Sequence, residues 1–236
     1  MNPFLKAFTP EKLSEAWEIV VRDFPHELWV TLYITLLSTL FAIIIGLPLG
    51  VILVTGDENG IHPLPKPLMK ALNVIINFLR SVPFLILIVV VIPLTRALVG
   101  TATGSVAIIV PLVVAAFPFV ARLVESSLRE LDPNIIEMAQ SMGASTMQIV
   151  LRVMLPESVP SLVSNFTLAI TTILGYTAMS GAVGGGGLGN IAIQIGYSRY
   201  KYAVLYIAMI VLVLVVQVFQ SVGSHLATKL DKRIKR

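Results

Sequence analysis

The feature that most constrains this chain is a series of long apolar blocks with very few charges. Crossing the hydrocarbon core of a bilayer as a helix takes about 20 apolar residues. Five segments reach that length, at residues 29–54, 81–99, 105–124, 160–180 and 202–223. Charged residues make up 13% of the chain, whereas a soluble domain carries about 25%. The sequence therefore predicts an all-α integral membrane protein with five transmembrane helices.

The second and third blocks each contain two prolines. Pro83 and Pro93 lie in the second, and Pro111 and Pro118 lie in the third. Membrane helices tolerate proline because neighbouring helices and hydroxyl side chains can satisfy the freed carbonyl groups. We therefore expect both spans to continue through their prolines.

The regions outside the spans are short and leave no room for a separate soluble domain. We expect an N-terminal external segment at 1–28, a transmembrane domain at 29–224 with a cytoplasmic loop at 125–157, and a basic cytoplasmic tail at 225–236. The start mixes apolar and acidic residues, which favours a short amphipathic helix. It differs from the basic start of a secretory signal, so the first span should remain in the mature protein.

The distribution of Lys and Arg among the loops predicts the orientation of the chain. The loops after the first and third spans and the C-terminal tail carry more of these residues than the opposite loops and the N-terminal segment. Lys and Arg accumulate on the cytoplasmic side of membrane proteins. We therefore expect the N-terminus outside the membrane and the C-terminus in the cytoplasm.

Several kinds of site are excluded or disfavoured by the sequence. There is no cysteine, and the three histidines (His26, His62 and His225) are far apart, so we expect no metal site. Gly184, Gly186 and Gly189 fit the dinucleotide pattern, but a membrane helix precedes them and no acidic residue follows until Asp231. No nucleophile–base pair, phosphate-binding loop or basic stripe for nucleic acid is present. We expect no catalytic residue and no cofactor on this chain.

The loop at 125–157 is the longest polar interruption that could fold. Pro133 breaks the preceding segment, Asn134 can cap a helix, and Glu137 follows three positions later as in a capping box. Gly143 allows either a close backbone approach or a bend between two short helices. Pro156 and Pro160 are expected to end this unit before the next span.

The same loop resembles the signature loop of the permease subunits of binding-protein-dependent ABC importers. That signature, the EAA motif, is Glu-Ala-Ala, three residues, Gly, nine residues, then Ile-x-Leu-Pro. Five residues of this chain match it at the same spacing: Glu137, Ala139, Gly143, Leu155 and Pro156. Met138 and Val153 depart from it but keep apolar character.

The resemblance implies that the loop forms a coupling helix which docks in a groove of a separate ATPase subunit. The implied docking residues are Glu137, Met138, Ala139, Gln140, Ser141, Gly143, Ala144, Leu155 and Pro156. Ala139 and Ala144 would offer a small apolar knob, flanked by polar side chains. Pro156 would pass the motion of this helix to the fourth span.

The resemblance extends to the methionine-uptake branch of the family, over nearly all of the chain. It is carried by residues 78–84, Phe-Leu-Arg-Ser-Val-Pro-Phe, and by the Gly-Tyr-Thr-Ala-Met-Ser-Gly-Ala-Val-Gly stretch at 175–184. It implies the type I importer permease fold in the bacterial cytoplasmic membrane, and D/L-methionine as substrate. It also implies an assembly of two copies of this chain, two ATPases that bind ATP and Mg²⁺, and an external substrate-binding (lipo)protein.

Three alternatives remain open. The chain could serve an importer of another amino acid or small polar solute, act alone as an ion-coupled carrier, or be a structural subunit without a solute. Ion-coupled carriers usually keep ionisable groups at mid-membrane. The apolar parts of the five spans hold none, at 30–54, 82–94, 106–121, 162–180 and 203–222. This absence favours energy supplied from outside the membrane.

Polar residues within the spans are candidates for the transport pathway. The fourth span follows the coupling loop directly, and its candidates are Thr171, Thr172, Gly175, Tyr176 and Met179. Met179 is unbranched and apolar, so we expect it to help form the outer gate. Two further polar rows are Thr31, Thr35 and Ser38, and Gln217, Gln220, Ser221 and Ser224. Such rows either line a pathway or form helix-packing seams, and packing is favoured.

Overall fold

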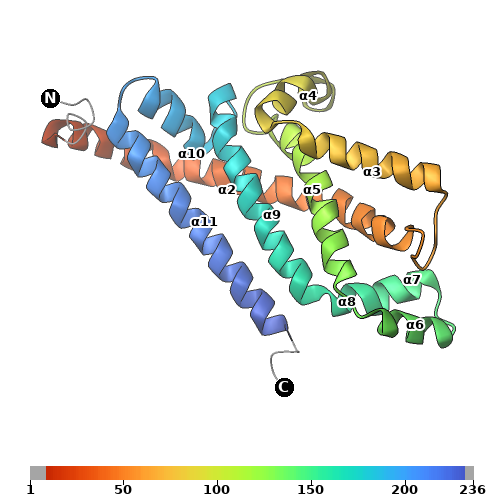
Figure 1. The fold of residues 1–236 in the computed structure, drawn as a ribbon. Helices are drawn as coiled ribbons and strands as arrows, with labels where there is room; N and C mark the ends of the chain where they lie inside the picture. The colour runs from red at the N-terminus through yellow and green to blue at the C-terminus, as the bar shows by residue number, and fades with distance from the viewer. Residues whose placement is uncertain (1–8, 232–236) are drawn as a thin grey trace. The chain divides into compact units, whose positions relative to one another are not determined.

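The structure is a computed structural model that describes residues 9–231 (Figure 1). Within this range every regular element is a helix. The same range is divided between two compact units. Unit 1 is drawn from Met1–Thr39, Pro83–Val113 and Ile170–Phe219, and unit 2 is drawn from Leu40–Val82, Val114–Ala169 and Gln220–Arg236.

Four single helices in the described range are long and apolar enough to cross a membrane, and one bent pair makes five. The four are α2 (Pro10–Thr55), α5 (Ile109–Arg129), α9 (Val159–Ser180, with the short η2 to Val183) and α11 (Tyr202–Leu230). The pair is α3 (Lys66–Ser81) with α4 (Phe84–Val99). The five predicted spans are confirmed on this count.

The helix α2 extends much further toward the N-terminus than the predicted span. Its 46 residues correspond to about 69 Å at 1.5 Å per residue, more than twice the thickness of the hydrocarbon core. It passes the predicted boundary at residue 28 without a break. The short amphipathic helix expected at the start is therefore the first part of the same helix.

The second span is broken where a continuous helix was expected. The chain bends by 114° between α3 and α4, and Pro83 lies at this break. The prediction that Pro83 lies inside a continuous helix is wrong, because the ring of a proline keeps the residue before it out of the helical region. Val82 accordingly has extended angles, φ −77° and ψ 124°. Pro93, by contrast, lies inside α4 as expected.

The core of unit 1 joins the first part of α2 to the segment that follows α9. Apolar side chains from α2, α10 (Gly187–Asn190), η3 (Ile191–Tyr197) and α11 form one cluster: Ala16, Ile19, Phe24, Leu188, Ile191, Ala192, Ala203, Val204 and Ala208. A side chain at Gly181 would collide with the backbone of Gly189. Gly181 and Gly189 therefore allow close backbone packing at this point.

The polar row on α2 is a packing seam, as favoured by the sequence. Thr31, Thr35 and Ser38 are buried. Thr31 Oγ accepts a hydrogen bond from Leu188 N at 2.8 Å, and the hydroxyls of Thr35 and Thr177 lie 3.4 Å apart. The row on α11, Gln217, Gln220, Ser221 and Ser224, is exposed in this chain, and its role stays a prediction.

In unit 2, the second part of α2 packs closely on α5. Added Cβ atoms at Gly46 and Gly50 would lie 2.8 Å from Val120 and 2.6 Å from Val124. The two glycines are four residues apart, the small-xxx-small spacing that lets membrane helices approach. A second cluster, of Leu53, Met69, Ile76 and Ala121, fixes α3 against this pair.

Candidate functional site

The predicted coupling loop folds into two short helices joined by a tight turn. The first is α6 (Pro133–Ser141) and the second is α7 (Thr146–Ile149), which Figure 1 shows following the C-terminal end of α5. Gly143 lies between them with φ +78°, a conformation that glycine adopts without strain. The bend predicted at Gly143 is confirmed.

The residue that caps α6 is Asp132. Its carboxylate accepts a hydrogen bond from Asn134 N at 3.0 Å, and Pro133 occupies the first helical position, where a missing N–H costs nothing. The predicted cap at Asn134 with Glu137 as its partner is wrong. Asp132 is as good an N-cap as asparagine, and proline in the next position marks it as the cap.

A true capping box is found one helix later. Ser145 Oγ accepts from Gln148 N at 3.4 Å, and Gln148 Oε1 accepts from Ser145 N at 2.8 Å. The Ser-x-x-Gln pattern is visible in the sequence and could have identified this helix start. It fixes the chain direction immediately after the turn at Gly143.

The helical path does not end after α7. It continues through a π-helical turn, η1 (Val150–Met154), and through α8 (Leu155–Glu157) into α9. Ser158, between α8 and α9, has right-handed helical angles, φ −88° and ψ 0°. The prediction that Pro156 and Pro160 end the unit is wrong, because each lies in the first turn of a helical segment, where proline is tolerated. The C-terminal part of the loop is thus a direct extension of the fourth span.

The surface of the coupling loop is largely exposed. Of the described side chains in α6, none is buried; Ala139, Ala144 and Leu155 are partly buried, and Glu137, Met138, Gln140, Ser141, Gly143 and Pro156 are exposed. Met142 and Met147 are also exposed, at 81% and 66%. The sequence reasoning missed these two methionines, although Met138 and Met142 are four residues apart on one helix face. Methionine is flexible and polarisable, and is common on adaptable docking surfaces.

A cavity of about 520 Å³ is lined in part by residues of α6. Its lining includes Ile136, Glu137 and Gln140 of α6, together with Asp57 and Arg129. Arg129 donates to Asp57 at 2.9 Å, and this hydrogen bond lowers the pKa of Asp57 below its ordinary value. Asp57 is therefore ionised at neutral pH.

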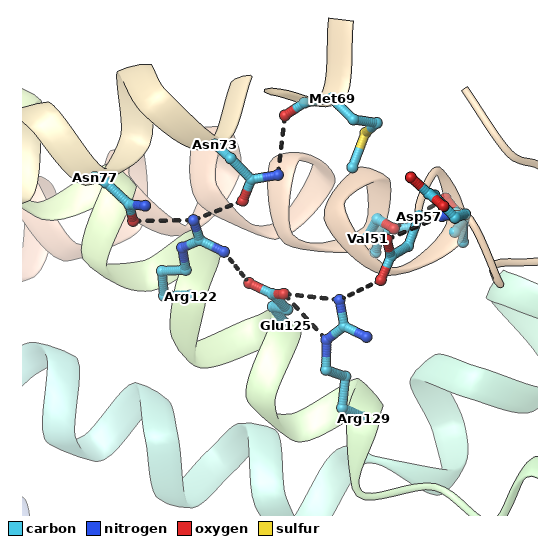
Figure 2. A network of polar contacts seen from close by, with 10 residues as sticks. Val51, Asp57, Met69, Asn73, Asn77, Arg122, Glu125 and Arg129 are labelled. Carbon is cyan, nitrogen blue, oxygen red and sulfur yellow. Dashed lines mark hydrogen bonds and ion pairs between the residues drawn. The ribbon is translucent and has the colours of Figure 1, made fainter. Parts of the chain in front are cut away.

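This ion pair is the outer end of a larger polar network (Figure 2). Glu125 bonds to Arg129 at 3.0 Å and to Arg122 at 2.6 Å. Arg122 also donates to Asn73 at 2.7 Å and to Asn77 at 3.0 Å. The network therefore connects α3, α5 and the loop after α2.

The predicted pathway residues lie on the C-terminal half of α9, within unit 1. Gly175 and Met179 are exposed and four residues apart, so they share a helix face. Tyr176 is partly buried and stacks on Phe84, with ring centroids 4.6 Å apart. Thr171 and Thr172 are partly buried. The structure thus places Gly175 and Met179 on one open face and fixes Tyr176 by packing.

Comparison with known proteins gives a consistent result. Residues 46–236 match the family described as binding-protein-dependent transport system inner membrane component. The probable D-methionine transport system permease protein MetI of Vibrio cholerae is 44% identical over 205 residues, which cover 87% of this chain and 91% of that protein. The methionine import system permease protein MetP of Bacillus subtilis is 41% identical over 168 residues, 71% of this chain and 76% of that one.

A solved structure agrees with the fold. A chain of the MetNI methionine ABC transporter, in inward-facing conformations, is 43% identical with a TM-score of 0.85, and the match covers 87% of this chain and 94% of that one. The expected all-α fold of a type I importer permease is confirmed. This chain therefore belongs to the family of inner membrane components of binding-protein-dependent transport systems.

Proposed function

We propose that this chain is the membrane permease of an ATP-driven importer of D- or L-methionine, and that a separate ATPase subunit supplies the energy. The observation that carries the proposal is the helical path that starts at Thr146, beside the exposed α6, and runs into the span α9. A displacement of the loop would reach a membrane helix without a flexible link. The methionine transport named for its relatives supports this substrate.

The exposed face of α6 would dock in the ATPase. Glu137, Met138 and Gln140 are exposed, so they are available to a partner of matching shape and charge. ATP and Mg²⁺ would be bound by that partner. Closure of two ATPases around ATP would move α6 and α7 together and favour the outward-open state of the permease. ATP hydrolysis would then return the permease to its starting state.

The assembly would contain two copies of this chain, two ATPases and an external binding protein. One chain offers one coupling loop, while closing ATPases act in pairs, so a two-fold pair of permeases is the economical arrangement. The open face at Gly175 and Met179 belongs to a membrane helix and would face the second copy across the pathway.

The N-terminus would be outside the membrane and the C-terminus in the cytoplasm. The turn at 56–65 and the coupling loop, both expected in the cytoplasm, fall in unit 2. The segments 100–104 and 181–201, both expected outside, fall in unit 1. The excess of Lys and Arg in the regions expected in the cytoplasm supports this orientation.

The direct test is uptake of labelled methionine by proteoliposomes that contain this chain, its ATPase and the binding protein. ATP inside the vesicles should drive uptake, and ionophores should not abolish it. Uptake that follows an ion gradient without ATP would favour a secondary carrier. ATP-driven uptake of a different amino acid, with none of methionine, would keep the importer and reject the substrate.

Met179 would help to close the outer gate. Its side chain is 50% exposed in this chain and unbranched, so it could fill a narrow constriction. Met179→Ala should raise ATP turnover in the absence of the binding protein, or increase leak. Thr167→Ala on the same helix is a suitable control. Unchanged coupling and leak in Met179→Ala would argue against the gate.

A further inference from the structure

The polar network around Glu125 brings four charged groups together at the C-terminal end of α5 (Figure 2). Arg122, Glu125 and Arg129 lie in α5, a candidate membrane span, and the side chains of Arg122 and Glu125 are only 20% and 13% exposed. With Asp57 included, the two arginines and two carboxylates balance in charge. The three residues lie at the C-terminal end of α5, the end expected on the cytoplasmic side, and taking charged groups out of water is costly unless they are paired and hydrogen-bonded.

Stability alone does not explain this network. Replacing a buried ion pair with apolar side chains of similar volume is often neutral or stabilising. The network is also incompletely satisfied, because Arg122 Nε is buried without a hydrogen-bond partner within residues 9–231. Because a buried network of this kind adds little net stability, its residues are candidates for positioning roles.

The network contacts α3, a helix that is bounded by a loop at one end and by a sharp break at the other. The loop after α2 precedes α3, and the 114° break at Val82 and Pro83 follows it. Within α3 only Met69 and Ile76 are buried, so apolar attachment is limited to a narrow stripe. The hydrogen bonds from Arg122 to Asn73 and Asn77 add a polar attachment beside that stripe.

The other end of the network lies next to the coupling loop. Arg129 is the last residue of α5, and Asp132, three residues later, caps α6. Arg129 and Asp57 also line the same cavity as Ile136, Glu137 and Gln140 of α6. A displacement of α6 therefore acts close to Arg129.

We propose that Glu125 is a positioning residue that makes α3, the first half of the broken span, move together with the coupling helix. This inference rests on the proposed function and adds a second route from the coupling loop, beside the helical path into α9. Glu125 is the junction because Oε2 contacts Arg122 and Oε1 contacts Arg129. A glutamine has one carbonyl oxygen, and its amide group would present a donor to one of the two arginines.

The first test compares Glu125→Gln with Glu130→Gln in the complete reconstituted transporter. Glu130 is an exposed carboxylate one residue beyond α5 and serves as the matched control. In Glu125→Gln we expect ATP turnover to stay within about twofold of the wild type, while methionine transported per ATP falls at least about fivefold. A proportional fall in ATP turnover and transport, or a wild-type ratio in Glu125→Gln, would overturn the proposal.

The second test follows the two routes separately. The chain has no cysteine, so one spin label per copy gives one distance across the pair. We would place it at Val74→Cys on α3 or at Ser164→Cys on α9, both exposed positions. On ATP binding both distances should change in the wild type, whereas in Glu125→Gln the α9 distance should change and the α3 distance should not.

An α3 distance that still responds to ATP in Glu125→Gln would refute the role of Glu125. An α3 distance that does not change on ATP binding in the wild type would refute the second route itself. These outcomes are distinct from failure of the proposed function, which would appear as absence of ATP-driven methionine uptake in the wild type.

Discussion

The cap of the coupling helix offers a sharp test of the proposed docking role. α6 has nine residues, too few to be stable as an isolated helix. Because its described side chains are not buried, tertiary packing adds little. The hydrogen bond from Asn134 N to Asp132 is therefore a large part of what holds the helix.

Asp132→Ala should destabilise α6 by about 1 kcal/mol, the typical cost of losing an N-cap. At room temperature this corresponds to about a fivefold change in the helix–coil equilibrium. If the ATPase binds only the helical form, the apparent affinity of the permease for the ATPase falls by up to about fivefold. The rest of the protein should be unaffected, since no buried contact is lost.

The measurement is titration of the reconstituted permease variant with its ATPase, with ATP turnover as the readout. Asp132→Ser should restore most of the affinity because serine also caps helices. Asn134→Ala is the matched control, since it removes a side-chain hydrogen bond to Asp132 but keeps the backbone donor. Equal defects in Asn134→Ala and Asp132→Ala, or no defect in either, would refute the reasoning.

Three further predictions follow from particular contacts. Gly50→Leu should lower the stability of the protein in detergent by about 1–3 kcal/mol, because the larger side chain would overpack against Val124. Gly175→Ala should not lower it, because there is open space around Gly175. Equal melting temperatures of these two variants would contradict the reasoning. Glu137→Arg should reduce stimulated ATP turnover without changing thermal stability, because this side chain is exposed; normal stimulation would reject its docking role. The lowered pKa of Asp57 means that its ion pair stabilises the protein above the ordinary Asp pKa of about 3.9, so the stability difference between wild type and Asp57→Asn should be constant from neutral pH to about pH 5 and vanish as the pH falls through the lowered pKa.

Much of the fold could be predicted because the bilayer imposes a length on apolar segments. The spans of α5, α9 and α11 were placed within a few residues at their N-terminal ends, since 20-residue apolar blocks have few alternatives. The α3–α4 break was not predicted, although Pro83 was visible. Proline is compatible with both a continuous and a broken membrane helix, and neighbouring contacts decide between them.

The coupling loop shows a different limit. The turn at Gly143 could be predicted because a glycine between two helical stretches has a specific backbone use. The cap was misplaced by two residues, since Asp132 and Asn134 are nearly equal as caps and only the position of Pro133 separates them. The helical path continues through Pro156 directly after a π-helical turn, η1, which the sequence pattern does not indicate.

The network around Glu125 was partly accessible to sequence reasoning. The pairs of Glu125 with Arg122 and with Arg129 have spacings of three and four residues within one helix, which favour contact. The bonds from Arg122 to Asn73 and Asn77 join residues 49 and 45 positions apart. Their existence depends on how α3 packs against α5, and a single sequence contains no direct signal for that packing.

The exposed fractions of the four charged groups separate a weak outer pair from a stronger inner pair in the proposed second route. The outer pair, Arg129 and Asp57, is 48% and 43% exposed, so water and salt weaken it, and such pairs contribute about 1 kcal/mol or less. The inner pair, Arg122 and Glu125, is largely shielded, and loss of one partner leaves an uncompensated charge. Breaking the outer pair would loosen one attachment, whereas loss of Glu125 would leave Arg122, the residue that bonds to Asn73 and Asn77 of α3, without its ion-pair partner. The second route from the coupling loop therefore depends on Glu125 far more than on Asp57.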